Sequence, residues 1–455
     1  MHTGVCGALC WLRLMRPCNL ALWSRLASMA EAVARAYRPN KAVDKYLREY
    51  AEAESQGFEG IEERWRAALV IPAFAEDYQR LKRVAEALTK TDCLQIWVIN
   101  APVSAEADAL ATTRECLRQA QNEGRTLWRR ANLQLVETAG RSILLVDRCA
   151  EEALIPKESG VGLARKIGGD IALALVVAGY LQTPWIHFTD ADAELPSDYF
   201  EQAPQQAGDA VALVHPFRHR GEGDARQQLL MQLYESKLRY YVAGLQKAGS
   251  PYAFHTIGST LACRTDAYAM VRGMPLRAAA EDFYLLNKLA KLGPIMQTKG
   301  GDIVLSGRLS RRVPFGTGPA LQKALEGDGA VFFYHPATYQ CLRILLQSVT
   351  ALWRLREQPE AALADISSEL GAYTGREDLA GSALEAFAIA GAVRRFAAQS
   401  STEQAFRRHF HCWFDGFQTL KWIHWWRDNL YPSIHCDHDE QVYALMNDIE
   451  DKDEV

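Results

Sequence analysis

Short apolar runs alternate with longer segments of helical periodicity along the first half of the chain. The apolar runs, each about as long as a buried strand, are Ala68–Pro72, Leu94–Ile99, Ile143–Val146 and Trp185–Phe188. Apolar residues recur at helical spacing in the segments Ala105–Gln121 and Gly162–Leu181, which separate some of these runs. This alternation predicts βαβ units, and therefore a mainly parallel sheet with helices on both faces. Right-handed crossovers would bring the carboxyl ends of the strands to one edge, where ligands bind in open α/β sheets.

The pattern changes after the fourth apolar run. Further strand candidates lie at Val211–Val214, Thr260–Cys263 and Ile303–Ser306, and the apolar residues from Leu229 to Leu245 have the spacing of a long amphipathic helix. From about His335 onward the pattern is helical only. We therefore predict an α/β domain over residues 65–330, a partly helical N-terminal extension over 1–64, and a helical C-terminal region over 331–455. Residues 1–28 fit a targeting peptide or an extension upstream of a start at Met29, and the fold prediction does not use them.

The composition is that of an ordinary globular protein. The chain has 455 residues, of which 49% are hydrophobic and 23% are charged, and its formal net charge is -4. This balance gives no basic excess of the kind that binds nucleic acid. No stretch approaches the roughly 20 apolar residues of a membrane-spanning helix, so we predict no transmembrane segment. The ten cysteines include no CxxC pair, which favours reduced thiols and a cytoplasmic protein over a disulfide scaffold.

Two aspartates, Asp190 and Asp192, follow the run Trp185–Phe188 almost directly. Residues two apart in an extended chain project to the same side, so both carboxylates can converge on one ion at the end of the strand. Hard oxygen ligands suit Mg²⁺ or Mn²⁺, which keep coordination positions for water and for diphosphate oxygens. Taken alone, the same spacing also fits a polar turn at a strand end.

Two other polar segments stand where a ligand site would need them. Pro72, Phe74 and Glu76 form the loop after the first strand, where a nucleoside would lie or where a helix simply begins. Glu281 and Asp282 open an amphipathic helix, so they are either the acidic first turn of that helix or catalytic acids.

Small residues accompany a basic pair in the segment Ala164–Gly168. They would allow close approach of a ligand, with Arg165 or Lys166 meeting a phosphate, or close packing of a helix on the sheet. The segment is not a phosphate-binding P-loop, because the Gly-Lys-Ser/Thr ending is absent.

The order of these segments resembles glycosyltransferase family 2 and its GT-A relatives. Their motifs run from V-I-P-A-[YF]-x-E through A-R-x-x-G, D-x-D and G-x-x-x-x-x-R to E-D. In this chain the corresponding segments are Val70–Glu76, Ala164–Gly168, Asp190–Asp192, Gly258–Arg264 and Glu281–Asp282. The resemblance covers roughly Arg66 to Phe315 and implies the GT-A fold, a Rossmann-like, mixed but mainly parallel sheet flanked by helices. The helical C-terminal region is then an extension of that fold.

The resemblance also implies a role for each matching position. Asp190 and Asp192 look like the pair that holds Mg²⁺ or Mn²⁺ and the donor diphosphate. Asp282 looks like the catalytic base of inverting members. The other donor-binding positions are the nucleoside loop Pro72, Phe74 and Glu76, and Arg165, which is similar to the arginine that closes on the donor. The implied reaction moves a hexose from a nucleoside diphosphate sugar to a hydroxyl of a small molecule or glycan, with inversion.

Three residues extend or depart from the family pattern. Asn100 ends the second strand, where the family usually has an acidic cluster that holds the nucleoside, and it would hydrogen-bond an edge of the base instead. Arg308, with Arg311 and Arg312, belongs to a dense basic loop that either closes over the diphosphate or an anionic acceptor or is solvated. His255 would face the acceptor, supply a third metal ligand, or be a structural histidine.

The missing acid keeps other functions open. A retaining GT-A enzyme of the glucosyl- or mannosylglycerate synthase type needs no base at the second acid pair. A nucleotidyltransferase also uses paired acids and Mg²⁺ on an α/β sheet, but it usually carries a glycine-rich N-terminal signature that this chain lacks. A sugar-nucleotide-binding protein without activity is the third alternative, and it has no chemical reason to keep Asp190, Asp192 and Asp282 together.

Overall fold

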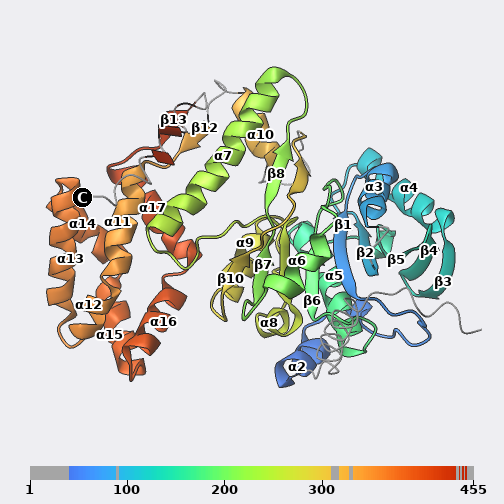
Figure 1. Ribbon diagram of the computed structural model, residues 1–455, viewed down its shortest axis with the longest axis horizontal. Coiled ribbons are helices and arrows are strands. Elements are labelled where there is room, and N and C mark those ends of the chain that lie inside the picture. Colours follow the sequence, from blue (N-terminus) through green and yellow to red (C-terminus); the bar gives the residue numbers. More distant parts are fainter. Residues whose placement is uncertain are drawn as a thin grey trace, which may run out of the picture.

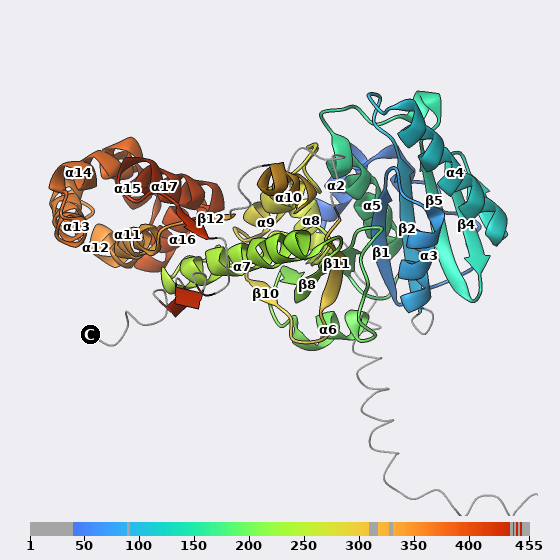
Figure 2. The same ribbon diagram turned by 90° about the horizontal axis from the view of Figure 1, so that it is seen from above.

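The computed structural model describes residues 40–88, 92–308, 317–326 and 331–436, and the single positions 440, 443, 444, 446 and 447. The predicted extension over residues 1–28, and Arg311 and Arg312 of the basic loop, lie outside the described residues. An α/β part occupies one end of the molecule and a mainly helical part the other (Figure 1). The region predicted as helical also contains the strands Val331–Phe333 and Ile434–Cys436, which are too short to give a strand pattern. The long helix α7 (Ala225–Lys247) extends from the first part to the second (Figure 1 and Figure 2).

A nine-stranded mixed sheet forms the centre of the α/β part. From one edge to the other its strands are β10 (Ile295–Gln297), β7 (Ala212–Val214), β9 (Leu261–Arg264), β6 (Trp185–Phe188), β1 (Ala67–Ala73), β2 (Cys93–Asn100), β5 (Arg141–Arg148), β4 (Leu133–Thr138) and β3 (Arg125–Arg130). The central strands β6, β1, β2 and β5 are parallel, while β9, β4 and β3 pair antiparallel with their neighbours. The predicted parallel core is therefore confirmed, and the carboxyl ends of β1, β2 and β6 meet at one edge.

Both faces of this sheet are covered, which explains why β1 and β2 are buried along their whole length. On one face, residues such as Val70 and Ile96 pack against α5 (Gly160–Val177). On the other face, their neighbours such as Ile71 and Trp97 share a core with α3 (Tyr78–Ala87) and α4 (Ala107–Glu123). This arrangement confirms the architecture expected from the sequence, a mixed, mainly parallel α/β sheet flanked by helices.

The hairpin of β3 and β4 is missing from the sequence prediction. β3 reads Arg-Thr-Leu-Trp-Arg-Arg and is the last strand of the sheet, so most of its side chains are exposed and it has no apolar run. Charged side chains on an edge strand also prevent pairing with another chain. Strand prediction from apolar runs fails here, because the strand is held by hydrogen bonds to β4 more than by its own burial.

Smaller elements surround the sheet. Two short two-stranded sheets pair β8 (Phe217–Arg220) with β11 (Ile303–Ser306) in parallel and β12 (Val331–Phe333) with β13 (Ile434–Cys436) antiparallel. The remaining helices of this part are α2 (Lys41–Glu49), α6 (Tyr199–Gln206), α8 (Thr265–Met270), α9 (Glu281–Leu289) and α10 (Thr317–Glu326), with short 3₁₀ turns at Ala53–Ser55 and Glu151–Ala153.

The C-terminal part has its own hydrophobic core. Its helices are α11 (Pro336–Gln347), α12 (Val349–Arg354), α13 (Pro359–Thr374), α14 (Glu377–Ala386), α15 (Ile389–Gln399), α16 (Glu403–Trp413) and α17 (Gly416–Asn429). Leu233 and Tyr240 of α7 belong to the same core as Trp422 and Trp426 of α17, so α7 ties the two parts together. Among the described residues, no helix combines the length and apolar character that crossing a bilayer requires.

Candidate active site

The loop after β1 turns sharply at the sheet edge. Ala75 has φ of 51°, in the left-handed region that costs a side-chain-bearing residue free energy, and its N–H donates to Thr113 Oγ1 at 3.0 Å. Asp77 then caps α3 by accepting from the Gln79 N–H. This turn aims Phe74 and Glu76 back over the sheet edge instead of into the helix.

Asn100 ends the neighbouring strand and fastens the two strand ends together. It is buried, and its side-chain amide donates to the carbonyls of Ala73 at 3.2 Å and Val98 at 3.0 Å. Because both amide hydrogens are used in this way, the Asn100 side chain has its carbonyl oxygen left to offer a ligand as an acceptor.

The aspartate pair lies where β6 ends. Each carboxylate is matched by an arginine from a distant part of the chain: Arg165 Nη2 lies 2.5 Å from Asp190 Oδ1, and Arg308 Nη2 lies 2.8 Å from Asp192 Oδ2. Asp190 keeps 42% of its side chain exposed, so it faces open space as well as its partner.

Arg165 is a buried cation between two acids. Only 4% of the residue is exposed, and its guanidinium pairs with both Asp190 and Glu281. Gly258 makes room for it, since a Cβ at that position would lie 2.7 Å from the guanidinium carbon. The glycine and arginine of two separate predicted motifs are therefore parts of one packing arrangement.

Glu281 and Asp282 open α9 with different environments. The residue before them, Ala280, has φ of 60°, again in the left-handed region. Glu281 is buried and paired with Arg165, whereas Asp282 is half-buried and accepts from the Phe283 N–H at 2.7 Å. Burial, together with the charge of Glu281, raises the pKa of Asp282 to about 7, well above the usual carboxyl value.

Arg308 links the nucleoside loop to the aspartate pair. Besides Asp192 it pairs with Glu76, with Nη1 lying 3.1 Å from Glu76 Oε2. The sequence prediction placed Glu76 and Arg308 in separate parts of a donor site, and the fold joins them directly.

These groups surround one cavity of about 760 Å³. Apart from Lys166, which the sequence offered as an alternative to Arg165, all the described residues predicted for the site except one line it: Pro72, Phe74, Glu76, Asn100, Arg165, Asp190, Asp192, Asp282 and Arg308. The cavity lies at the carboxyl ends of β1, β2 and β6, as expected for an open α/β sheet.

His255 is the exception. It lines a small cavity of about 60 Å³ with mostly apolar walls, which adjoins the larger cavity at Leu238, Thr256, Ile257 and Phe283, and it stacks edge-on against Phe217 at 5.0 Å. Burial and the charge of Arg239 lower its pKa to about 4. Of the three roles that the sequence offered for His255, its packing against Phe217 favours the structural one.

The carboxylates of Asp190 and Asp192 fit a cation that is held jointly by the protein and a ligand. No group of three or more His, Cys, Asp or Glu side chains in the described ranges is arranged to hold a metal ion. Asp190 and Asp192 form only a pair, and Mg²⁺ is typically bound by one or two carboxylates together with substrate phosphates. The pair therefore suits a diphosphate-bound cation better than a metal cage built by the protein alone.

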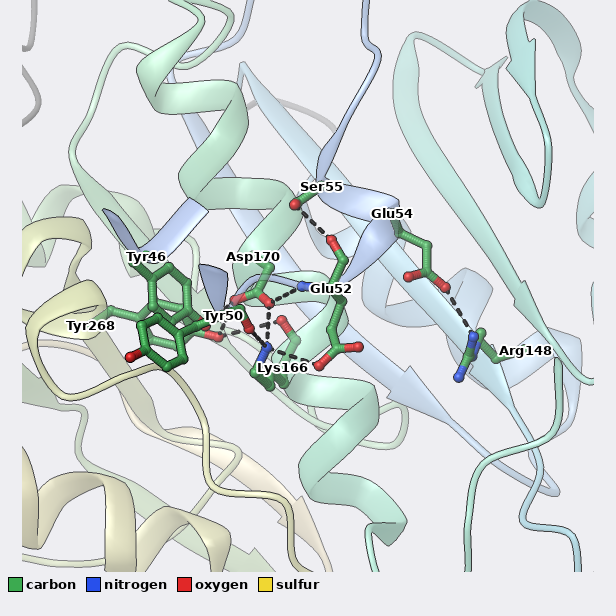
Figure 3. Close-up of polar contacts among 9 residues, drawn as sticks. All are labelled: Tyr46, Tyr50, Glu52, Glu54, Ser55, Arg148, Lys166, Asp170 and Tyr268. Carbon is green, nitrogen blue, oxygen red and sulfur yellow. Dashed lines mark hydrogen bonds and ion pairs between the residues drawn. The ribbon is translucent and has the colours of Figure 1, made fainter. Parts of the chain in front are cut away.

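Lys166 points away from the cavity, so it does not take the phosphate-contacting role that the sequence offered as one alternative. Its Nζ donates to Asp170 Oδ2 at 2.8 Å and to the Tyr50 carbonyl at 2.7 Å, and it lies 2.9 Å from Glu52 Oε1 (Figure 3). Successive helical residues face different sides, so Arg165 and Lys166 serve different neighbours.

The small residues of α5 serve packing. A Cβ at Gly168 would lie 2.3 Å from Val70 of β1, and one at Gly169 would lie 2.7 Å from the Tyr268 hydroxyl. Of the two interpretations offered by the sequence, close contact of the helix with its surroundings is the one that these glycines explain.

Several cavity residues escaped the sequence prediction. Lys157 precedes α5, and His219, Tyr234 and Leu238 come from β8 and α7. Leu238 was recognised only as part of the apolar face of a helix, because periodicity alone does not distinguish a core contact from a cavity wall. A basic residue just before a helix N-terminus was the one available signal for Lys157.

Comparison with known proteins gives similarity in structure only. No protein-family model matches the chain, and no curated protein matches it in sequence. It is similar to S. aureus TarS 1-349 in complex with UDP-GlcNAc, with 12% identity and a TM-score of 0.35, covering 75% of this chain and 89% of that chain. It is also similar to S. aureus TarS 1-349 in complex with UDP, with 11% identity and a TM-score of 0.32, covering 73% and 91%.

Proposed function

We propose that this protein is a glycosyltransferase that moves a hexose from a nucleoside diphosphate sugar to an acceptor hydroxyl, with inversion at the anomeric carbon. The observation that carries the proposal is the convergence of the predicted donor-binding loop, the aspartate pair, two arginines and Asp282 on one cavity of about 760 Å³. This volume lies within the range of about 300–1,000 Å³ that is typical of small-molecule sites.

The nucleoside end of the donor lies at the strand ends of β1 and β2. Phe74 offers an apolar side chain to the base. Asn100 offers its side-chain amide oxygen, because the nitrogen of the same amide already donates to two backbone carbonyls. Such an oxygen accepts from a ring N–H, which uracil and guanine carry at their Watson–Crick edges.

The diphosphate lies beside Asp190 and Asp192. Arg165 and Arg308 already stand against these carboxylates, and their guanidinium groups supply charge-assisted hydrogen bonds to phosphate oxygens. Asp190 and Asp192 are the residues that would hold Mg²⁺ or Mn²⁺, which supplies neutralisation of the negative charge on the leaving diphosphate when it is bound.

Asp282 accepts the proton of the acceptor hydroxyl. As the acceptor oxygen bonds to the anomeric carbon, the bond from that carbon to the diphosphate breaks and its electron pair leaves with the diphosphate. A base is most effective when its pKa is near the working pH, so a pKa of about 7 suits Asp282 for this step.

The proposal is tested first by thermal unfolding in the presence of a panel of nucleoside diphosphate sugars, with and without Mg²⁺ or Mn²⁺. A donor at about 100 times its Kd should add roughly 2.7 kcal/mol of stability. A metal-dependent shift with one donor is expected. The absence of a shift with every donor, in either metal, would contradict the proposal.

Asp192→Ala tests the metal role directly. We expect it to abolish the metal-dependent part of the donor shift while the protein keeps its fold, as checked by circular dichroism. Asp209→Ala, an exposed aspartate outside the cavity, is the matched control. Donor affinity with Mn²⁺ that is unchanged in Asp192→Ala would refute the metal role.

A further inference from the structure

A second cavity of about 590 Å³ lies beside the candidate active site, on α7. Its lining residues are His219, Gly221, Gln228, Met231, Gln232, Glu235, Ser236, Arg239, Tyr443 and Met446. His219 also lines the first cavity, so the two cavities adjoin at this residue. Tyr234 and Leu238 of α7, one residue before Glu235 and Arg239, line the first cavity as well, so the same helix forms a wall of both.

His219 is held rigidly at the junction. Its Nδ1 lies 2.9 Å from Glu235 Oε2, and its backbone N–H donates to the same oxygen at 2.5 Å. The imidazole is flanked edge-on by the rings of Phe217 and Tyr234 and only 2% of its side chain is exposed. Because these contacts hold the ring in one orientation, the wall that His219 contributes between the two cavities has a fixed shape.

The two charged residues of the second cavity, Glu235 and Arg239, form an ion pair. Arg239 Nη2 lies 2.8 Å from Glu235 Oε1 and donates to the Phe217 carbonyl at 2.6 Å. Burial alone would raise the pKa of Glu235, but hydrogen bonds from His219 and Arg239 outweigh it and lower the pKa to about 2. The carboxylate therefore stays ionised and paired, and the cation beside it is already neutralised.

The other polar side chains of the second cavity are neutral, and each has both hydrogen-bond donor and acceptor groups. Gln228, Gln232 and Ser236 follow one another at four-residue spacing along α7, so they form a row on one face of the helix. Amides and hydroxyls donate and accept, which matches the hydroxyl groups of a sugar. The opposite charges of Glu235 and Arg239 cancel, so the residues that line this cavity carry no net positive charge to attract a phosphorylated or sulfated chain.

We propose that the acceptor is an uncharged, hydroxyl-rich chain of several units, such as a neutral oligosaccharide, whose reacting end lies beside Asp282 and whose remainder passes His219 into the second cavity. The proposal rests on the proposed function, because it extends the acceptor side of that site. His219 and the row of Gln228, Gln232 and Ser236 then determine specificity for the distal units of the acceptor.

The test uses the full-length protein on a printed array of neutral, phosphorylated, sulfated and sialylated oligosaccharides of one to eight units. We expect retention on neutral oligosaccharides and stronger retention on longer members of a series than on the monosaccharide. Preference for the anionic glycans, retention independent of length, or no retention on any neutral glycan would overturn the proposal. Binding of the panel of nucleoside diphosphate sugars, measured on the same preparation, reports on the donor half, so a failure of the proposed function is seen separately.

The variant Gln228→Ala/Gln232→Ala then locates the binding. Both side chains are exposed, so the fold tolerates the change. With the best array ligand labelled for fluorescence anisotropy, we expect the affinity of the long oligosaccharide to fall about tenfold or more while that of its shortest binding member is unchanged. Gln246→Ala, an exposed glutamine farther along α7, is the control. Equal loss for long and short members, or no loss, would overturn the assignment of the second cavity.

Discussion

The two helices that bring polar side chains to the cavity are held in different ways. In α5, every residue from Gly162 to Val176 is buried, and the helix is packed on the central strands. α9 is half as long, with one buried apolar side and a charged first turn, and its outer end contacts the C-terminal part. Arg165 of α5 and Glu281 of α9 form an ion pair, so the site depends on the relative position of two differently supported helices.

The support of α5 is a buried polar cluster at its outer side. Asp170 is fully buried and accepts four hydrogen bonds, from the hydroxyls of Tyr46 and Tyr268, the N–H of Glu52 and the Lys166 ammonium (Figure 3). In this way α2 and the segment that follows it are fastened to the back of the helix that carries Arg165.

At its outer end, α9 is linked to the C-terminal part by one aspartate at the start of α17. One oxygen of Asp415 caps α17 by accepting from the N–H groups of Phe417 and Gln418, and the other accepts from Asn287 at 3.0 Å and pairs with Lys291 at 2.5 Å. The apolar sides of both helices are buried in one core, but their polar links differ. The ion pair that fastens α5 is almost fully buried, whereas the one at the outer end of α9 is partly exposed, so we expect the loss of the first to cost more.

The largest expected effect comes from Asp170→Ala. Removing one partner from a buried ion pair typically costs about 3–5 kcal/mol. Here the change removes the buried carboxylate that pairs with Lys166 and accepts from the Tyr46 hydroxyl. The free energy of unfolding measured in urea should fall by that amount, whereas the exposed Asp209→Ala should change it by less than about 0.5 kcal/mol. A loss below about 1 kcal/mol in Asp170→Ala would show that the cluster does not secure α5.

On α9, Asp282→Asn should separate catalysis from binding. If Asp282 is the base, turnover should fall by about 10²–10⁴-fold while the donor-dependent rise in stability remains. Steady-state kinetics and thermal unfolding on the same preparations check both halves. Near-normal turnover would contradict inversion and would favour a retaining transferase.

The pH dependence of transfer sharpens the role of the same residue. Asp282 must be deprotonated to accept a proton, so with a pKa of about 7 the rate should fall about tenfold per unit as the pH drops below that value. Glu281→Gln removes a negative neighbour, which should lower the pKa of Asp282. The pH below which the transfer rate falls should then also be lower. If that pH is unchanged or higher in the variant, Asp282 is not the titrating group.

The smallest effect should come from Asp415. Asp415→Asn keeps an oxygen for the helix cap but loses the charge pair with Lys291, and we expect it to cost up to about 1 kcal/mol. Asp415→Ala loses the cap as well and should cost about 1 kcal/mol more. Urea unfolding, with hydrogen exchange of α9 and α17, distinguishes the two variants. Equal stability losses would mean that the cap contributes nothing.

Part of the site was predictable because it depends on local order in the chain. Apolar runs marked β1, β2 and β6, and polar residues directly after each run had to lie at the sheet edge once the strands were parallel. Asp190, Asp192 and Phe74 were therefore found from position, whereas Asn100 was noticed only because it departs from the family pattern. The helix start at Glu281 and Asp282 was visible for the same reason.

Other features depend on which distant segments meet, and only the tertiary structure decided them. Arg308 and Glu76 are far apart in the chain, and nothing in their neighbourhoods indicates that they pair. Lys166 and Arg165 are adjacent, yet one is buried behind the helix and the other lines the cavity. His255 lines a small, mostly apolar cavity beside the main one, where its ring packs edge-on against Phe217.

The sequence by itself determined the parallel sheet and the residues at its edge, because strand periodicity and chain order act over a few residues. The tertiary structure determined which charges are paired, which glycines serve packing and where the second cavity lies. These features depend on burial and on contacts between segments that no local pattern encodes.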